Sequence, residues 1–135
     1  MAKTFRIKIL ASDHPFYQGE CEMVIFPAID GEMGVLADHE PMVTCLTSGE
    51  MRFLVDGEWQ SAAVADGIVV ITPNHVEILA DTIEKPEDID QHRAELAKQR
   101  AEEKLRQQLS KQEYYQTVAA VNRAVNRLKV KARHI

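Results

Sequence analysis

The stretch KPEDIDQHRAELAKQR, residues 85–100, decides the fold, because the character of the chain changes within it. All six glycines lie at or before Gly67 and all five prolines lie at or before Pro86, whereas residues 87–135 contain neither. The charge changes at the same place: residues 1–86 carry 5 basic and 14 acidic residues, and residues 87–135 carry 11 and 7. Two compositions and two signs of charge that meet at Pro86 predict two domains, 1–86 and 87–135.

The segment before Pro86 has the pattern of short β-strands. Phe5, Ile7 and Ile9 alternate with other residues, as in a strand with one buried face. Turn-forming pairs recur along the segment: His14-Pro15, Asp30-Gly31, Ser48-Gly49, Asp56-Gly57, Asp66-Gly67 and Pro73-Asn74. About ten short strands separated by such turns predict an all-β sandwich of two packed sheets.

The segment after Pro86 has the pattern of two helices. Pro86 can begin a helix whose first turn holds the acidic residues that suit the positive end of the helix dipole, Glu87, Asp88 and Asp90. Ser110-Lys111-Gln112-Glu113 has the form of a capping box and predicts where the second helix begins. One helix carries a stripe of small residues and the other an apolar seam: Ala94, Ala97, Ala101 and Leu105, then Tyr114, Val118, Val121, Val125 and Leu128. These patterns predict an antiparallel two-helix hairpin, which has little core of its own and must lean on another surface.

Composition and motif content narrow the function classes. No apolar run approaches the ~20 residues of a membrane-spanning helix, and we expect no targeting segment at the start of the chain. Cys21 and Cys45 have no metal or redox spacing, so buried free thiols in a reducing compartment are the favoured interpretation. The chain has no glycine-rich phosphate loop ending in Lys-Ser/Thr and no catalytic constellation. We therefore expect a protein without enzymatic activity of its own and without a metal site.

Three motifs follow one another in an order that is typical of one protein family. The first is Gly31-Glu32-Met33-Gly34-Val35-Leu36 with His39-Glu40-Pro41, the second covers residues 73–82, and the third is Ile89-Asp90-Gln91-His92-Arg93-Ala94. In this order and at these separations they resemble the epsilon subunits of F-type ATP synthases of bacteria and chloroplasts. The resemblance covers nearly the whole chain.

The resemblance implies a role and a set of partners. The role is that of a regulatory rotor subunit of the central stalk, which couples proton-driven rotation to ATP synthesis on the cytoplasmic face of the bacterial cell membrane, as a peripheral protein. It implies that Glu32 lies near the membrane c-ring and that His39 lies near the gamma subunit. The basic C-terminal helix is then expected to meet the alpha and beta subunits of the catalytic head through Arg123, Arg127, Lys129, Lys131 and Arg133.

Four arginines of the second domain predict an anion site. Arg93 and Arg100 are seven residues apart, and Arg123 and Arg127 are four apart, so each pair shares one helix face. In an antiparallel hairpin the two pairs would face each other, and their charges would repel unless an anion such as a triphosphate lay between them. The resemblance implies regulatory ATP at this place, bound but not hydrolysed, with its Mg²⁺ requirement left open. It also assigns Ile89, Asp90 and Ala94 to the ATP signature, and Glu84 is a candidate contact to the base.

These expectations combine into a two-state switch. With ATP the hairpin folds compactly, and without ATP it extends along gamma and blocks hydrolysis, so the ATP concentration sets the balance. The alternative is a generic assembly adaptor, with a β-sandwich docking domain and a coiled-coil hairpin.

Two other interpretations of the loop motif are weaker. Gly31-x-x-Gly34 also matches the loop with which KH domains clamp nucleic acid, but its flanking carboxylates would repel phosphates. A turn residue with positive φ explains the glycine better, and we expect no nucleic-acid partner. Asp38 and His39 could form half of a catalytic dyad, but no nucleophile motif accompanies them, which favours a structural or interface histidine.

Overall fold

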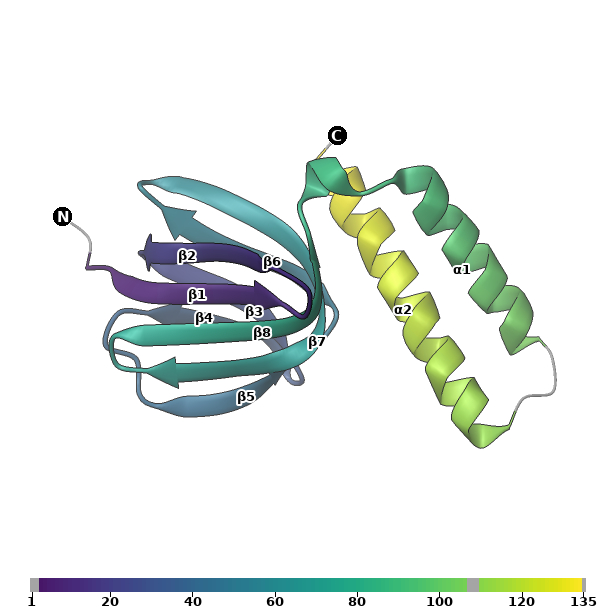
Figure 1. Cartoon of the computed structure of the whole chain (residues 1–135), viewed down its shortest axis with the longest axis horizontal. Helices are drawn as coiled ribbons and strands as arrows, with labels where there is room; N and C mark the ends of the chain where they lie inside the picture. The colour runs from purple at the N-terminus through teal and green to yellow at the C-terminus, as the bar shows by residue number, and fades with distance from the viewer. Residues whose placement is uncertain (1–2, 107–109, 135) are drawn as a thin grey trace. The chain divides into compact units, whose positions relative to one another are not determined.

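The computed structural model describes residues 3–106 and 110–134, which form two compact units, Met1–Lys85 and Pro86–Ile135. The first unit is a β-sandwich of the strands β1 (Phe5–Ala11), β2 (Pro15–Cys21), β3 (Met23–Ala28), β4 (Gly31–Leu36), β5 (Met42–Leu46), β6 (Gly49–Val55), β7 (Glu58–Thr72) and β8 (His75–Glu84). The second unit holds the 3₁₀ turn η1 (Pro86–Asp88) and the helices α1 (Gln91–Leu105) and α2 (Lys111–Arg133) (Figure 1). The predicted fold class is confirmed, with eight strands in the described part of the chain rather than about ten.

The sandwich has two layers that share one long strand. The strands follow the order β2-β1-β8-β7-β5-β3-β4, and β6 pairs with β3 and β7. The first part of β7, from Glu58 to Val64, pairs with β6, whereas its later part, from Gly67 to Ile71, pairs with β5. One layer therefore holds β2, β1, β8, β5 and the later part of β7, and the other holds β4, β3, β6 and the first part of β7. Within this unit β1 and β8 pair in parallel, and the remaining pairs described are antiparallel.

The strand number differs from the prediction partly because Asp66-Gly67 is not a turn. This pair lies inside the 15-residue strand β7, where that strand passes from β6 to β5. A Cβ atom at Gly67 would lie 1.9 Å from the backbone oxygen of Leu79, so only glycine allows β7 and β8 to approach so closely. The predicted turn was wrong because the glycine allows close approach of the neighbouring strand β8 and does not reverse the direction of the chain.

The core of the sandwich consists of large apolar side chains. Those with less than 2% exposure include Phe26, Phe53, Ile7, Ile9, Met51, Ile71 and Ile78. The Phe53 ring contacts the rings of Phe16 and Tyr17, with centroid distances of 6.4 and 5.1 Å. Cys21 is buried as expected, but Cys45 is exposed, because it occupies an outward position of β5 opposite Ile68.

Side chains cap both helices of the second unit. The backbone N–H of Arg93 donates to Asp90 Oδ1 at 3.1 Å, so α1 begins at Gln91. The acidic residues Glu87 and Asp88 therefore lie in η1, not in the first turn of α1 as predicted. At the start of α2, the N–H of Glu113 donates to Ser110 Oγ at 3.2 Å. The capping interpretation of Ser110 is confirmed.

The hairpin packs mainly through small residues. The buried helix positions are Ala94 and Ala101 on α1 and Thr117, Ala124 and Val130 on α2. Of the seam predicted for α2, Tyr114 is 50% exposed and the other four residues are half-buried, so the fully buried positions of α2 are not those of the predicted seam. Alanines let two helices approach closely. Among the described residues, no helix has the length and apolar character needed to cross a membrane.

Candidate functional site

A hollow with a volume of about 340 Å³ lies between α1 and α2. Its lining consists of Ala97, Arg100, Ala101 and Lys104 from α1, and Gln116, Thr117 and Ala120 from α2. Alanine side chains leave the space open, while Arg100 and Lys104 bring positive charge to it. Its size falls in the range of roughly 300–1,000 Å³ that is usual for small-molecule sites.

Two stripes of residues, one on each helix and with the same spacing, lie on this side of the hairpin. The α1 stripe consists of Arg93, Ala97, Arg100 and Lys104, and the α2 stripe consists of Gln116, Ala120, Arg123 and Arg127. Both follow the spacing i, i+4, i+7, i+11, and at about 100° per residue each stripe spans only about 60° of its helix. We call the two stripes together the cationic groove. Five of its eight residues are cations.

The register of the helices brings the arginines to one side. The hollow brings residues 97–104 of α1 beside residues 116–120 of α2, and Lys131 Nζ donates to the Pro86 carbonyl at 3.3 Å near the open end of the hairpin. Continued along both stripes, this antiparallel register sets Arg93 level with the turn from Arg123 to Arg127. Arg100 lies about 10 Å further along the axis, at ~1.5 Å per residue. Arg100 lines the hollow itself, whereas the other three arginines lie on the same helix faces nearer the open end, so the four are spread along the hairpin rather than gathered at one point.

One carboxylate of α1, that of Glu102, lies away from the groove. Glu102 Oε1 pairs with Lys98 Nζ at 3.9 Å, and both residues lie about 140–180° around the helix from Arg93. Because this pair is turned away, it does not neutralise the groove. Charge in the groove therefore favours an anion.

The other residues of the predicted ATP signature have structural positions. Ile89 and Ala94 are buried, and Asp90 caps α1. This arrangement fixes the first turn of α1 and with it the place of Arg93. Glu84 ends β8 in the first unit, where its side chain is half-buried.

The C-terminal cations differ in exposure. Lys129 and Arg133 are exposed, and the half-buried Lys131 donates to the Pro86 carbonyl and so holds the end of α2 to η1. Nothing in the sequence indicates this contact, because it joins residues 45 positions apart.

Glu32 lies in β4, and His39 lies in the loop that follows this strand. Glu32 Oε2 pairs with Arg52 Nη2 at 3.1 Å, and His39 Nδ1 lies 2.9 Å from the Glu40 carbonyl, to which it donates. The Asp38 carboxylate pairs with Lys3 Nζ at 3.0 Å. Asp38 is thus engaged with Lys3, and the interpretation of Asp38 and His39 as a dyad has no support.

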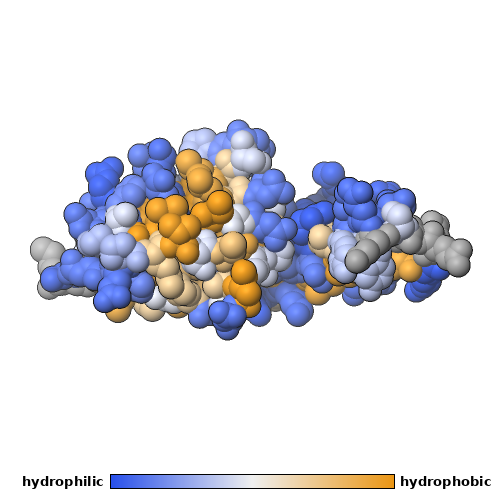
Figure 2. Space-filling model, turned by 90° about the horizontal axis from the view of Figure 1, so that it is seen from below, coloured by the Kyte–Doolittle hydropathy of each residue, from blue (hydrophilic) through white to orange (hydrophobic). Residues whose placement is uncertain are grey.

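One outer face of the sandwich is apolar, which the sequence did not indicate. Cross-strand pairs align Cys45 with Ile68, Ile68 with Leu79, and Leu79 with Leu10, while Val43 stands opposite Val70. We call these six residues the first apolar face. Val43 is 70% exposed. Figure 2, which views the molecule from the side where Figure 1 draws β5, shows hydrophobic side chains gathered on the sandwich.

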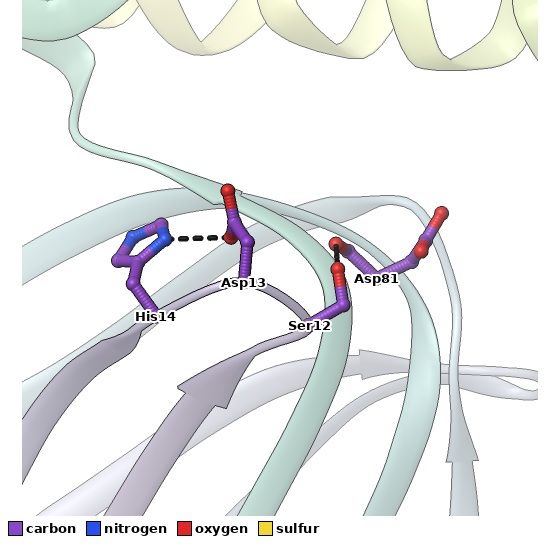
Figure 3. A network of polar contacts seen from close by, with 4 residues as sticks. All are labelled: Ser12, Asp13, His14 and Asp81. Atoms are coloured by element: carbon purple, nitrogen blue, oxygen red, sulfur yellow. Dashed lines mark hydrogen bonds and ion pairs between the residues drawn. The ribbon is translucent and has the colours of Figure 1, made fainter.

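A second polar cluster joins the β1–β2 turn to β8 (Figure 3). His14 Nδ1 lies 2.6 Å from Asp13 Oδ1, and this hydrogen bond lowers the pKa of the Asp13 carboxyl. Ser12 Oγ donates to the backbone oxygen of Asp81 at 2.9 Å. The serine therefore lacks the hydrogen bond to histidine that would activate it as a nucleophile. Within the described ranges, no group of three or more potential metal ligands comes together.

Comparison with known proteins identifies both parts of the chain. Residues 4–86 match the beta-sandwich domain of the ATP synthase delta/epsilon chain family, and residues 87–132 match the long alpha-helix domain of the same family.

Relatives and solved structures agree with this match. An ATP synthase epsilon chain of Ruminiclostridium cellulolyticum is 48% identical over 125 residues, which cover 93% of each chain. That of Bacillus licheniformis is 42% identical over 95% of this chain and 98% of its own. A chain of the Euglena gracilis mitochondrial ATP synthase has a similar fold, with a TM-score of 0.81 at 21% identity over 98% of this chain and 82% of its own. The chain belongs to the ATP synthase delta/epsilon chain family.

Proposed function

We propose that this chain is a regulatory rotor subunit of an ATP synthase, in which the sandwich provides the mechanical connection and the hairpin senses ATP. Membership of the epsilon chain family supports a place in the central stalk. The solved structures that share its fold include a chain from a Tetrahymena thermophila central stalk and c-ring assembly, at a TM-score of 0.71. On this proposal the chain is peripheral to the membrane, held on its cytoplasmic face by protein contacts, and performs no catalysis.

The sandwich offers surfaces suited to two partners. The first apolar face has the exposed hydrophobic character of a protein interface and is our candidate for the contact with the gamma subunit. His39 follows β4 and precedes β5, whose Val43 and Cys45 belong to this face. Glu32 is our candidate for the contact with the c-ring.

The observation that carries the ATP-sensing part is the cationic groove. Five cations lie along two facing stripes, and Arg100 and Lys104 among them line a hollow with apolar walls. A nucleoside triphosphate supplies negative charge for the arginines and a flat base for the alanine-lined hollow. Since the groove is built from both helices, its ligand stabilises the pair and shifts the population toward the closed hairpin.

The released hairpin would provide the inhibitory state. Its α2 carries half-buried Val118, Val121 and Val125 and ends in Lys129 and Arg133. An extended α2 could lay its valines on gamma while its cations meet acidic segments of the alpha and beta subunits. Deleting residues 87–135 should then raise ATP hydrolysis by the assembled complex and leave proton-coupled synthesis largely intact.

Calorimetric titration of the isolated chain with ATP tests the site. Loss of a guanidinium–phosphate contact of about 1.5–3 kcal/mol predicts that Arg93→Ala weakens binding roughly tenfold or more. Arg93→Lys should restore binding only in part, because a point charge cannot reproduce the fork. Lys98→Ala removes one charge from the opposite side of α1 and should change affinity less than about twofold. Equal affinities of the wild type and Arg93→Ala would refute the sensor and leave the stalk assignment standing.

A further inference from the structure

A second apolar row crosses the other layer of the sandwich. Met23 of β3 stands opposite both Leu36 of β4 and Leu54 of β6, and Leu54 stands opposite Trp59 of β7. These four residues, which we call the second apolar face, form an unbroken row over four strands. They alternate with buried Val24, Val35 and Phe53, so they lie on the outside of the layer. At the ends of the row, Leu36 is 58% exposed and Trp59 is 51% exposed.

The row contains a hollow. A depression of about 360 Å³ is lined by Lys3, Glu22, Met23, Leu36, Ala37 and Leu54. The methyl group of Met23 lies 3.0 Å from where a Cβ atom of Gly34 would be, so the Met23 side chain extends over β4, at a position that has no side chain of its own. The hollow is thus bounded by apolar atoms and has the size to take one large apolar side chain from a partner.

Carboxylates lie beside this face. Glu22 lines the hollow, and Asp56 lies in the turn between β6 and β7. The cations beside the row are already paired: Lys3 Nζ lies 3.0 Å from Asp38 Oδ2, and Arg52 Nη2 lies 3.1 Å from Glu32 Oε2. An approaching molecule therefore meets an apolar strip bordered by an excess of carboxylates.

We propose that the second apolar face binds a basic amphipathic segment of a partner protein, which places one apolar side chain in the hollow and its lysines or arginines near Glu22. An apolar centre with a charged rim is the usual anatomy of a protein interface, and charge complementarity selects the partner. Anionic lipid and nucleic acid are disfavoured, because both would bring phosphates to this rim. A second copy of the sandwich is disfavoured for the same reason, since residues 1–86 carry 14 acidic and 5 basic residues.

This surface is separate from those that the proposed function uses. The first apolar face lies on β1, β5, β7 and β8, whereas this row lies on β3, β4, β6 and the other end of β7. The inference therefore neither rests on ATP sensing nor fails with it.

Trp59 is the single tryptophan of the chain, so its fluorescence reports directly on this face. The probe is a short amphipathic helical peptide of leucine and lysine, with a leucine–glutamate peptide of the same pattern as its control. We expect saturable binding with a blue shift of the Trp59 emission for the first peptide only, weakened by salt. Absence of that shift would overturn the proposal.

Matched variants separate this face from general charge attraction. Met23→Ser and Leu36→Ser should each weaken peptide binding about tenfold, as expected for residues at the centre of an interface. Glu22→Gln should weaken it less, and its salt dependence should decrease. Val43→Ser makes the same kind of change on the first apolar face and should alter affinity less than about twofold. Equal losses for Leu36→Ser and Val43→Ser would mean that the peptide has no preference for this face and would refute the site.

A photoreactive benzoylphenylalanine in place of Leu36, in cells that contain the intact complex, tests the partner. The expected cross-linked peptide is rich in lysine or arginine and carries apolar residues three or four positions apart. Cross-linking to a second copy of this chain, to lipid, to nucleic acid, to an acidic segment or to nothing would each overturn the proposal.

Discussion

The sandwich and the hairpin are held together by different means. The sandwich buries large side chains such as Phe26, Phe53 and Ile78 between two layers of strands. The hairpin unit buries three alanines and few larger apolar side chains, Ile89 and Val130 among them, together with Thr117, whose hydroxyl donates to the Glu113 carbonyl at 2.7 Å. Burial of apolar area stabilises in proportion to that area, at about 25 cal/mol per Å², so an alanine contributes far less than a phenylalanine.

This difference suits the two units to different tasks. A unit with a large core keeps one shape and can transmit force between partners. Helices of about 15–23 residues joined by small contacts are close to marginal stability, so a ligand or a partner surface can decide whether they stay paired. On the proposed function, rigidity and sensing are divided between the two halves of one chain.

The largest expected effect lies in the core of the sandwich. Phe53→Ala should reduce the free energy of unfolding by about 3–5 kcal/mol, because it leaves a cavity among Phe16, Tyr17 and the strands around them. Urea unfolding followed by the β-sheet signal in circular dichroism measures this loss. The hairpin variant Thr117→Ala should leave the same transition unchanged. An equal shift for both variants would mean that the two units unfold as one.

The capping serine offers a smaller test of the hairpin. Ser110→Ala removes the acceptor of the Glu113 N–H and should destabilise α2 by about 1 kcal/mol. The helical signal should melt at a lower temperature. Ser12→Ala removes the hydrogen bond from the Ser12 hydroxyl to the backbone oxygen of Asp81 in the sandwich, and it is the matched control. A helical melt that shifts equally in both variants would show that the cap has no specific effect.

The sequence predicted local features of both units well. Alternation of apolar residues placed the strands, and Ser110 with Glu113 located the start of α2. The spacing of Arg93, Arg100, Arg123 and Arg127 predicted cations on one face of each helix, and the structure places Arg100 at the hollow between the helices. These features could be predicted because each depends on the periodicity of a single element.

Features that depend on contact between elements could not be predicted. In the sequence alone, Gly67 indicates a turn. Its actual role, close packing against the backbone oxygen of Leu79, is visible only in the structure. The seam of α2 could not be assigned from its spacing alone, because its fully buried residues, Thr117, Ala124 and Val130, are not those of the predicted seam. Both apolar faces arise from cross-strand register, which joins residues as distant in sequence as Leu10 and Leu79.

The smallest expected effect concerns the two thiols of the sandwich. Burial raises the pKa of Cys21 to about 12, so its thiol stays protonated and shielded at pH 8, whereas Cys45 is exposed. A maleimide should therefore modify Cys45 rapidly, and Cys21 only after unfolding. Binding of gamma to the first apolar face should protect Cys45. Rapid modification of both thiols in the native chain would contradict a rigid sandwich. If Cys45 stays reactive when gamma is bound, the first apolar face is not the contact with gamma.

Amide hydrogen exchange of the isolated chain, with and without ATP, tests the central claim most directly. If ATP holds α1 and α2 together through the cationic groove, the amides of Gln91–Leu105 and Lys111–Arg133 should exchange more slowly with ATP. The strands of the sandwich should exchange equally slowly in both conditions, and Arg93→Ala should abolish most of the difference. Equal exchange of the helices with and without ATP, at concentrations that saturate the wild type, would contradict an ATP-stabilised hairpin.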